Sequence, residues 1–196
     1  MEKGDYISTI LRSKQTVLSA KDIMLLWGEP TSDAARVRIN YYAKNGDLYR
    51  IRRGYYSKDK NYNKFELATK IFTPSYVSFE TVLGQAGITF QHYSQIFVAS
   101  SVTREITADG QVYAYRRIKD AILTNHLGIE NKDNYSTAST ERAFLDVVYL
   151  NKDYHFDNLS ALNWDKVFEI LPIYGGNKRM EKAVKKYYEA TKAEIK

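Results

Sequence analysis

The side chains best suited to chemistry lie in two short runs near the N-terminus, and both runs suit contact with nucleic acid. Residues 31–44 carry hydroxyl, amide and guanidinium groups at helical spacing, and residues 50–53 hold three arginines. Arginine donates to phosphate oxygens and guanine edges, and asparagine pairs with adenine. We expect groove contacts from Arg36, Arg38, Asn40 and Tyr41, phosphate contacts from Thr31, Ser32 and Lys44, and hairpin contacts from Arg50, Arg52 and Arg53.

Other kinds of site find little support in the residue types. Cysteine is absent, which excludes disulfides, thiolate zinc sites and cysteine nucleophiles. The three histidines, His92, His126 and His155, lie far apart without metal-ligand spacing. The chain has no glycine-rich phosphate loop, and Ser100-Ser101 lacks the glycines of a nucleophile elbow. We therefore predict a protein without catalytic residues, metal or cofactor.

Three charged residues in the second half of the chain have a structural rather than a catalytic interpretation. Glu141, Arg142 and Asp146 fall close together on a predicted helix. Acidic and basic side chains at a helix start usually act as caps and surface ion pairs. We expect that role here.

The basic charge gathers at both ends of the sequence. The chain holds 29 Lys and Arg against 23 Asp and Glu, a net charge of +6. Residues 1–60 have a net charge of +5, residues 61–176 of −3 and residues 177–196 of +4. A basic N-terminal segment is typical of a phosphate-binding surface. No apolar run is long enough to cross a membrane, so a cytoplasmic protein without a membrane partner is predicted.

Two short helices and a hairpin would position the candidate contacts. Apolar residues recur at helical spacing over residues 5–13, and Ser19 with Asp22 resembles a capping box for a helix that ends at Gly28. A third helix is predicted over residues 33–44, after the N-cap pair at 31–32. Residues 48–56 alternate like a strand and turn at Gly54. This order predicts a winged helix-turn-helix over residues 1–60.

The spacing also predicts which faces are buried. Ala35, Ile39 and Tyr42 share the inner face of the third helix. Tyr49 and Ile51 would face the helices, leaving the arginines outside. Duplex DNA is the expected partner. RNA binding through exposed tyrosines, and a winged helix that serves as a protein-interaction module, are the alternatives.

The remaining sequence predicts a C-terminal domain over residues 61–196, after a polar connector at 57–63. Helices are expected over residues 64–72 and 141–150, and strand-like stretches over 95–115, 121–127 and 135–138. Residues 177–196 form a basic amphipathic helix, either docked with a solvated lysine face or contacting nucleic acid or a partner. The predicted fold class is α+β: a winged helix-turn-helix followed by a mixed α/β domain that ends in a basic helix.

Three ordered blocks of sequence resemble AbiE-type (type IV) antitoxins, which are bacterial transcriptional regulators of phage-defence loci. The first is the run from Ile39 through Tyr42, Gly46, Leu48 and Ile51 to the hairpin residues Arg53-Gly54-Tyr55-Tyr56. The second is 74–83 with Gly87-Ile88, and the third is 138–146. Thr140 stands where relatives often have proline, and Tyr42 where they often have leucine.

The resemblance implies a function in two parts. The N-terminal winged helix would repress its own operon by binding inverted repeats in duplex DNA. The C-terminal domain would counter a nucleotidyltransferase-like toxin in an abortive-infection system, without a stable complex. The expected DNA contacts are then residues 31–44 with Arg50, Arg52 and Arg53.

Overall fold

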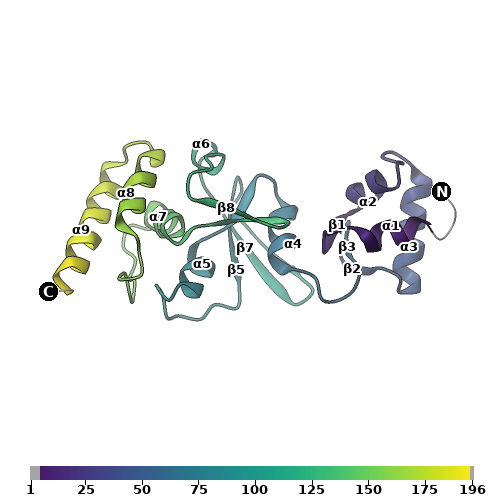
Figure 1. Cartoon of the computed structure of the whole chain (residues 1–196), viewed down its shortest axis with the longest axis horizontal. Coiled ribbons are helices and arrows are strands. Elements are labelled where there is room, and N and C mark those ends of the chain that lie inside the picture. The colour runs from purple at the N-terminus through teal and green to yellow at the C-terminus, as the bar shows by residue number, and fades with distance from the viewer. Residues whose placement is uncertain (1–4, 195–196) are drawn as a thin grey trace.

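The computed structural model describes residues 5–194 of the 196-residue chain. The elements follow the chain along the long axis of the molecule, from the N-terminal helices at one end to the last helix at the other (Figure 1). The fold is mixed α+β, with two separate sheets. We call residues 5–57 the N-terminal unit and residues 64–194 the C-terminal unit.

The N-terminal unit places helices on one face of a small sheet. Ser19 and Asp22 form the predicted capping box at the start of the second helix. Ser32 caps the third helix, and Gly46 ends it in the left-handed region with φ 82°. Its elements are α1 (Asp5–Arg12), β1 (Val17–Ser19), α2 (Ala20–Leu26), α3 (Asp33–Asn45), β2 (Tyr49–Arg52) and β3 (Tyr55–Ser57).

The small sheet has the antiparallel order β1-β3-β2 and is covered on both faces. Leu18 and Tyr56 pair across the strands and pack with the N-terminal helices. Val17 and Ile51 instead belong to the core of the C-terminal unit, against which Tyr49 also packs. The prediction that Tyr49 and Ile51 face the helices is therefore wrong. Alternation along a strand separates its two faces, but it does not say which face meets the larger core.

The C-terminal unit is built on a six-stranded mixed sheet of order β6-β7-β5-β4-β9-β8. Strands β5 and β7 run parallel, as do β4 and β9, and the remaining neighbours are antiparallel. All five residues of β5 are buried, as expected for a central strand. The strands are β4 (Ser75–Val77), β5 (Ile96–Ser100), β6 (Arg104–Ala108), β7 (Gln111–Arg117), β8 (Ile129–Lys132) and β9 (Tyr135–Ala138).

Helices cover this sheet and extend beyond it. Helix α5 contacts β5 and α7, and α8 and α9 pack on α7. The predicted strand over residues 121–127 is wrong, because the chain there forms the short helix α6 and a turn. The helices are α4 (Lys64–Ile71), α5 (Phe79–Gln85), α6 (Asp120–Leu123), α7 (Thr140–Leu150), α8 (Trp164–Ile170) and α9 (Lys178–Glu194), with a 3-10 helix at Leu171–Tyr174.

Membrane-spanning helices and metal sites are two features that residues 5–194 do not show. None of the helices there combines the length and apolar character needed to cross a membrane. No three His, Asp or Glu side chains in this part of the chain come together as a metal site.

Candidate nucleic-acid interface

Helix α3 presents one polar face to solvent and buries the other. Ala35, Ile39 and Tyr42 are its buried residues, as predicted. On the opposite face Asn40 and Lys44 are exposed. Val37 and Tyr41 are 69% and 49% exposed there, a large amount for apolar and aromatic side chains. The face is therefore free to meet a partner.

The hairpin adds an arginine to this face. Arg50 lies opposite Tyr56 in the register of the sheet, on the side toward the helices. With Asn40, Ala43 and Lys44 it lines a shallow hollow of about 240 Å³. The structure thus brings together three candidate contacts from two elements: an amide, an ammonium and a guanidinium group.

Arg53 and Arg52 diverge at the tip of the hairpin. Arg53 is exposed in the turn next to Gly54, which has φ 84°. A register shift between Arg50 and Arg52 turns Arg52 to the other side of the sheet. There its guanidinium carbon lies 5.8 Å from the ring centroid of Tyr55, and Nη1 is buried. Arg50 and Arg53 therefore remain accessible to a ligand, whereas Arg52 faces the C-terminal unit.

Arg38 is held by the N-terminal helices. Its guanidinium carbon stacks 3.8 Å from the ring centroid of Tyr6 and 5.5 Å from that of Trp27. Its Nη1 donates to both carboxylate oxygens of Glu29, at 3.1 and 3.2 Å. The Tyr6 hydroxyl donates to the same carboxylate at 2.8 Å and, with Arg38, lowers the pKa of Glu29. These contacts join α3 to α1 and to the segment after α2. Because the Arg38 guanidinium is engaged in them, we do not include Arg38 in the proposed interface.

The remaining candidates lie at the start of α3. Thr31 is exposed. The Ser32 hydroxyl accepts from the Ala35 amide at 3.2 Å, so it serves first as a helix cap. Arg36 pairs with Asp33 at 3.0 Å, and both side chains are largely exposed. Such a pair is weak, and a phosphate group can replace Asp33 as the partner of Arg36.

The basic C-terminal helix is remote from this face. Helix α9 lies at the opposite end of the molecule from α3 (Figure 1). Its lysines 178, 182, 185 and 186 are exposed, while Met180 and Val184 are buried against the C-terminal unit. Arg179 donates to the carbonyls of Val148, Tyr149 and Asn151 at 2.7–3.0 Å and so caps α7.

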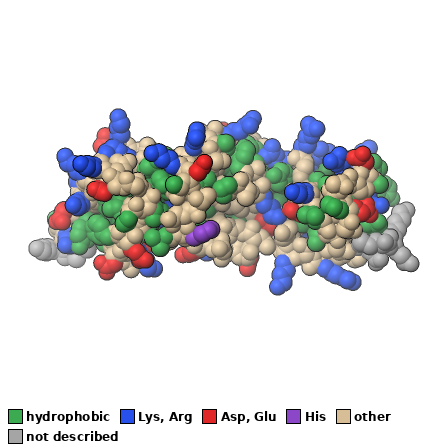
Figure 2. Space-filling view, turned by 90° about the horizontal axis from the view of Figure 1, so that it is seen from above, with side chains coloured by type: hydrophobic (Ala, Val, Ile, Leu, Met, Phe, Trp, Pro, Cys, Tyr) green, Lys and Arg blue, Asp and Glu red, His purple; other side chains and the backbone are tan. Residues whose placement is uncertain are grey.

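Basic side chains are not confined to the two ends of the molecule. Lys and Arg side chains also project along one long edge of its surface (Figure 2).

A buried ionic cluster in the C-terminal unit was missed by sequence reasoning. Arg142 and Asp146, expected in surface ion pairs, are both fully buried, with Nε 3.5 Å from Oδ1. Asp146 accepts from the hydroxyls of Ser78 at 2.7 Å, Tyr76 at 3.0 Å and Tyr174 at 2.7 Å. The sequence shows that Arg142 and Asp146 lie one helical turn apart. It does not show that other elements cover this face of α7.

The cluster is closed to ligands and holds elements together. Arg142 donates to the carbonyls of Leu127 at 2.7 Å and Ile122 at 2.8 Å, and to the Tyr76 hydroxyl at 3.0 Å. Burial raises the pKa of Asp146, an effect that Arg142 and the hydroxyl donors oppose. Burial likewise raises the pKa of Tyr76 and of Tyr174 well above the ordinary value. The arrangement ties α7 to β4, α6 and the 3-10 helix.

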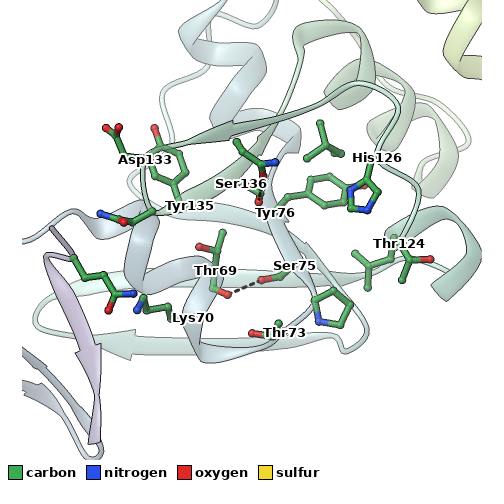
Figure 3. Close-up of a pocket in the computed structure, with 16 residues that line it drawn as sticks. Thr69, Lys70, Thr73, Ser75, Tyr76, Thr124, His126, Asp133, Tyr135 and Ser136 are labelled. Carbon is green, nitrogen blue, oxygen red and sulfur yellow. Dashed lines mark hydrogen bonds between the residues drawn. The ribbon is translucent and has the colours of Figure 1, made fainter. Parts of the chain in front are cut away.

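A groove of about 640 Å³ lies between α4, the segment that leads into β4 and the β8–β9 hairpin (Figure 3). Two of its hydroxyl groups donate to the local backbone. Ser75 donates to the carbonyl of Thr69 at 3.2 Å, and Thr124 to that of Asp120 at 2.8 Å. Lys70 is 3.2 Å from Asp22 and 3.7 Å from Glu66. These two hydroxyls and the lysine are therefore engaged by groups of the protein itself.

Comparison with known proteins leaves the relationship at the level of fold. No protein-family model and no curated protein matches the sequence. The structure is similar to the crystal structure of the RV2827C protein from Mycobacterium tuberculosis, with a TM-score of 0.52. The match covers 92% of this chain and 79% of that chain at 10% sequence identity. The chain therefore shares a fold with this protein over most of its length.

Proposed function

We propose that the N-terminal unit is a winged helix that binds duplex DNA, with α3 as the recognition helix and the β2–β3 hairpin as the wing. The element order supports this proposal: a helix, a strand, two helices and a hairpin whose second strand pairs with the first strand of the unit. The net charge of +5 over residues 1–60 favours a phosphate-rich partner.

One observation carries the proposal most directly. Asn40 and Lys44 from α3 and Arg50 from the hairpin converge on one exposed surface. A helix of 13 residues fits the major groove, and a basic hairpin beside it can follow the phosphate backbone. The proposed contacts are Thr31, Ser32, Arg36, Asn40, Tyr41, Lys44, Arg50 and Arg53.

We further propose that the chain is an autorepressor and the antitoxin of a type IV toxin–antitoxin system. Its sequence resemblance to AbiE-type antitoxins supports this role. The second and third blocks of that resemblance meet in the fold, where Tyr76 and Ser78 donate to Asp146. The proposed partner of the C-terminal unit is a nucleotidyltransferase-like toxin, countered without a stable complex.

The DNA-binding proposal is tested by fluorescence anisotropy with the full chain, across salt concentrations. We expect about a hundredfold preference for the DNA upstream of its own gene over a scrambled duplex at physiological salt. Arg50→Ala should weaken this binding, whereas Lys166→Ala, which removes an exposed lysine of α8, should not. Equal binding to both duplexes that disappears with salt contradicts a specific repressor.

The antitoxin proposal is tested in cells that express a nucleotidyltransferase encoded beside this gene. Co-expression of the full chain should restore growth. The variant Arg50→Ala should still restore it if protection acts through the C-terminal unit. Growth arrest that persists although the chain accumulates in soluble, folded form contradicts the antitoxin role.

A second candidate function rests on a different surface of the N-terminal unit. Leu11 of α1 and Leu25 and Leu26 of α2 are 53%, 54% and 40% exposed. Exposed apolar side chains of this kind favour a protein-interaction module. That function predicts weak binding to all DNA sequences alike, so the same anisotropy measurement separates the two candidates.

A further inference from the structure

The exposed face of α3 carries an apolar side chain, Val37, that neither helix propensity nor packing explains. At 100° per residue Val37 lies within about 20° of the direction opposite the buried residues Ala35, Ile39 and Tyr42. It is 69% exposed. Valine is a weaker helix former than the straight-chain residues usual at solvated positions. Val37 thus costs helix stability and stays largely exposed among the residues that the structure describes.

The groups around Val37 are suited to reading base edges. Asn40 follows one turn later on the same face, is exposed, and lines the hollow together with Lys44 and Arg50. An asparagine amide can bind N6 and N7 of adenine together, and an apolar side chain can contact the thymine 5-methyl group. Lys44 and Arg50, beside them, can bind phosphate groups of the DNA backbone.

We propose that Val37 and Asn40 make this surface specific for A·T pairs, with Val37 on a thymine methyl group and Asn40 on an adenine. This inference rests on the proposed DNA-binding function and deepens it. Side chains three residues apart on a helix have Cβ atoms about 5–6 Å apart, and base pairs rise about 3.4 Å. The thymine and the adenine therefore lie in neighbouring pairs or two pairs apart.

The test begins with the sequences that the full chain selects from a random duplex pool. Each thymine of the enriched duplex is then replaced in turn by deoxyuridine, which removes only the 5-methyl group. We expect one replacement to weaken binding of the unaltered chain about fourfold, the value of one buried methyl group. That same replacement should not affect Val37→Ala, because the contact is already lost.

A parallel substitution tests Asn40. Replacing the contacted adenine by 7-deazaadenine removes the N7 acceptor and should weaken binding of the unaltered chain about tenfold. The variant Asn40→Ala should bind both duplexes equally. Leu25→Ala, which truncates an apolar side chain of similar exposure on α2, should keep full sensitivity to both base changes. Circular dichroism of each variant verifies that the fold is unchanged.

The outcomes separate this inference from the function on which it rests. Enrichment of one sequence whose deoxyuridine forms bind as tightly as the thymine form overturns the role of Val37 and leaves the DNA-binding proposal standing. Persistent sensitivity to deoxyuridine in Val37→Ala overturns it as well. A pool that yields no enriched sequence contradicts both, and it leaves the exposed valine to a protein partner.

Discussion

At the scale of single residues, the chain uses arginine in three different ways. Arg142 is buried in an ionic cluster, Arg38 is stacked on aromatic rings, and Arg50 is exposed beside α3. A sequence does not separate these roles, since all three arginines lie in or next to amphipathic segments. The partners decide the role: a buried carboxylate, a pair of rings, or solvent.

The buried cluster predicts a large effect of a small change. Asp146→Asn keeps the size of the side chain but removes the charge opposite Arg142 and one of the two acceptor oxygens that the hydroxyls use. We expect a loss of about 3–5 kcal/mol in the free energy of unfolding, measured by urea denaturation. Asp33→Asn, which breaks an exposed pair, should cost less than about 1 kcal/mol. Equal stability of the two variants contradicts a structural role for the cluster.

Arg38 and Arg50 should give opposite results when each is replaced by alanine. Arg38→Ala removes the stacking on Tyr6 and the pair with Glu29, so it should lower the free energy of unfolding by about 1 kcal/mol with little effect on DNA affinity. Arg50→Ala should lower DNA affinity and leave stability unchanged. Thermal unfolding and anisotropy on the same two variants measure both quantities. A loss of affinity in Arg38→Ala without a loss of stability would return Arg38 to the interface.

At the scale of elements, the hairpin divides its arginines between two faces. Arg50 and Arg53 remain accessible, while Arg52 lies against Tyr55 after the register shift. Each lost phosphate contact should reduce the slope of log affinity against log salt by about 0.9. We therefore expect a smaller slope in Arg53→Ala and in Arg50→Ala. Arg52→Ala should keep the slope, and a reduced slope in this variant would place all three arginines on the backbone.

The elements that could be predicted from sequence are those with strong local signals. Helix α3 has an N-cap serine, a clear apolar face and a terminal glycine, and its predicted end differs from the observed one by a single residue. The strand predicted over residues 121–127 fails because its apolar residues form only one helical turn, too short for a period to show. Strand β8 has one partly buried residue among exposed ones, so it carries no alternation.

The candidate site could be predicted in outline but not in its detail. Helical spacing placed Asn40 and Lys44 on the outer face of α3. It could not show that a register shift separates Arg50 from Arg52, since the shift arises from pairing with β3. Nor could it show that Tyr6 and Glu29, which both lie outside α3, hold Arg38. These facts depend on contacts between elements.

At the scale of the whole molecule, buried tyrosines should set an alkaline limit to stability. Burial raises the pKa values of Tyr62, Tyr76, Tyr113, Tyr115, Tyr154 and Tyr174. An unfolded tyrosine titrates near pH 10, so the folded state holds these protons more tightly than the unfolded state does. Their contribution to stability is complete below about pH 10 and is lost as the pH rises further. The part of the tyrosinate absorbance that comes from these six residues should therefore appear together with the loss of the native far-ultraviolet circular dichroism. Tyrosinate absorbance that reaches its full value while the dichroism stays native contradicts the burial of these groups.

The two units are joined by apolar and polar contacts. Val17 and Ile51 of the small sheet lie in the core of the C-terminal unit. The amide and hydroxyl of Thr16 donate to the buried carboxylate of Glu66, at 2.9 and 2.6 Å. Tyr49 donates to Asp109 at 2.7 Å. An N-terminal unit connected to the C-terminal unit only by a flexible linker would have none of these contacts.

This shared core predicts that both units unfold together, and the two tryptophans can report on them separately. Trp27 is buried among the N-terminal helices, and Trp164 packs on the C-terminal core. In Trp164→Phe and Trp27→Phe, the remaining fluorescence should change at the same urea concentration. Ile51→Ala empties a buried position between the units. Added to each of these two variants, it should lower the free energy of unfolding by about 2–5 kcal/mol and shift the urea midpoints of both tryptophan signals equally. If only the Trp27 signal moves, the N-terminal unit unfolds alone, and its docking could then change between free and DNA-bound states. A common shift instead means that α3 and the C-terminal core unfold as one cooperative unit.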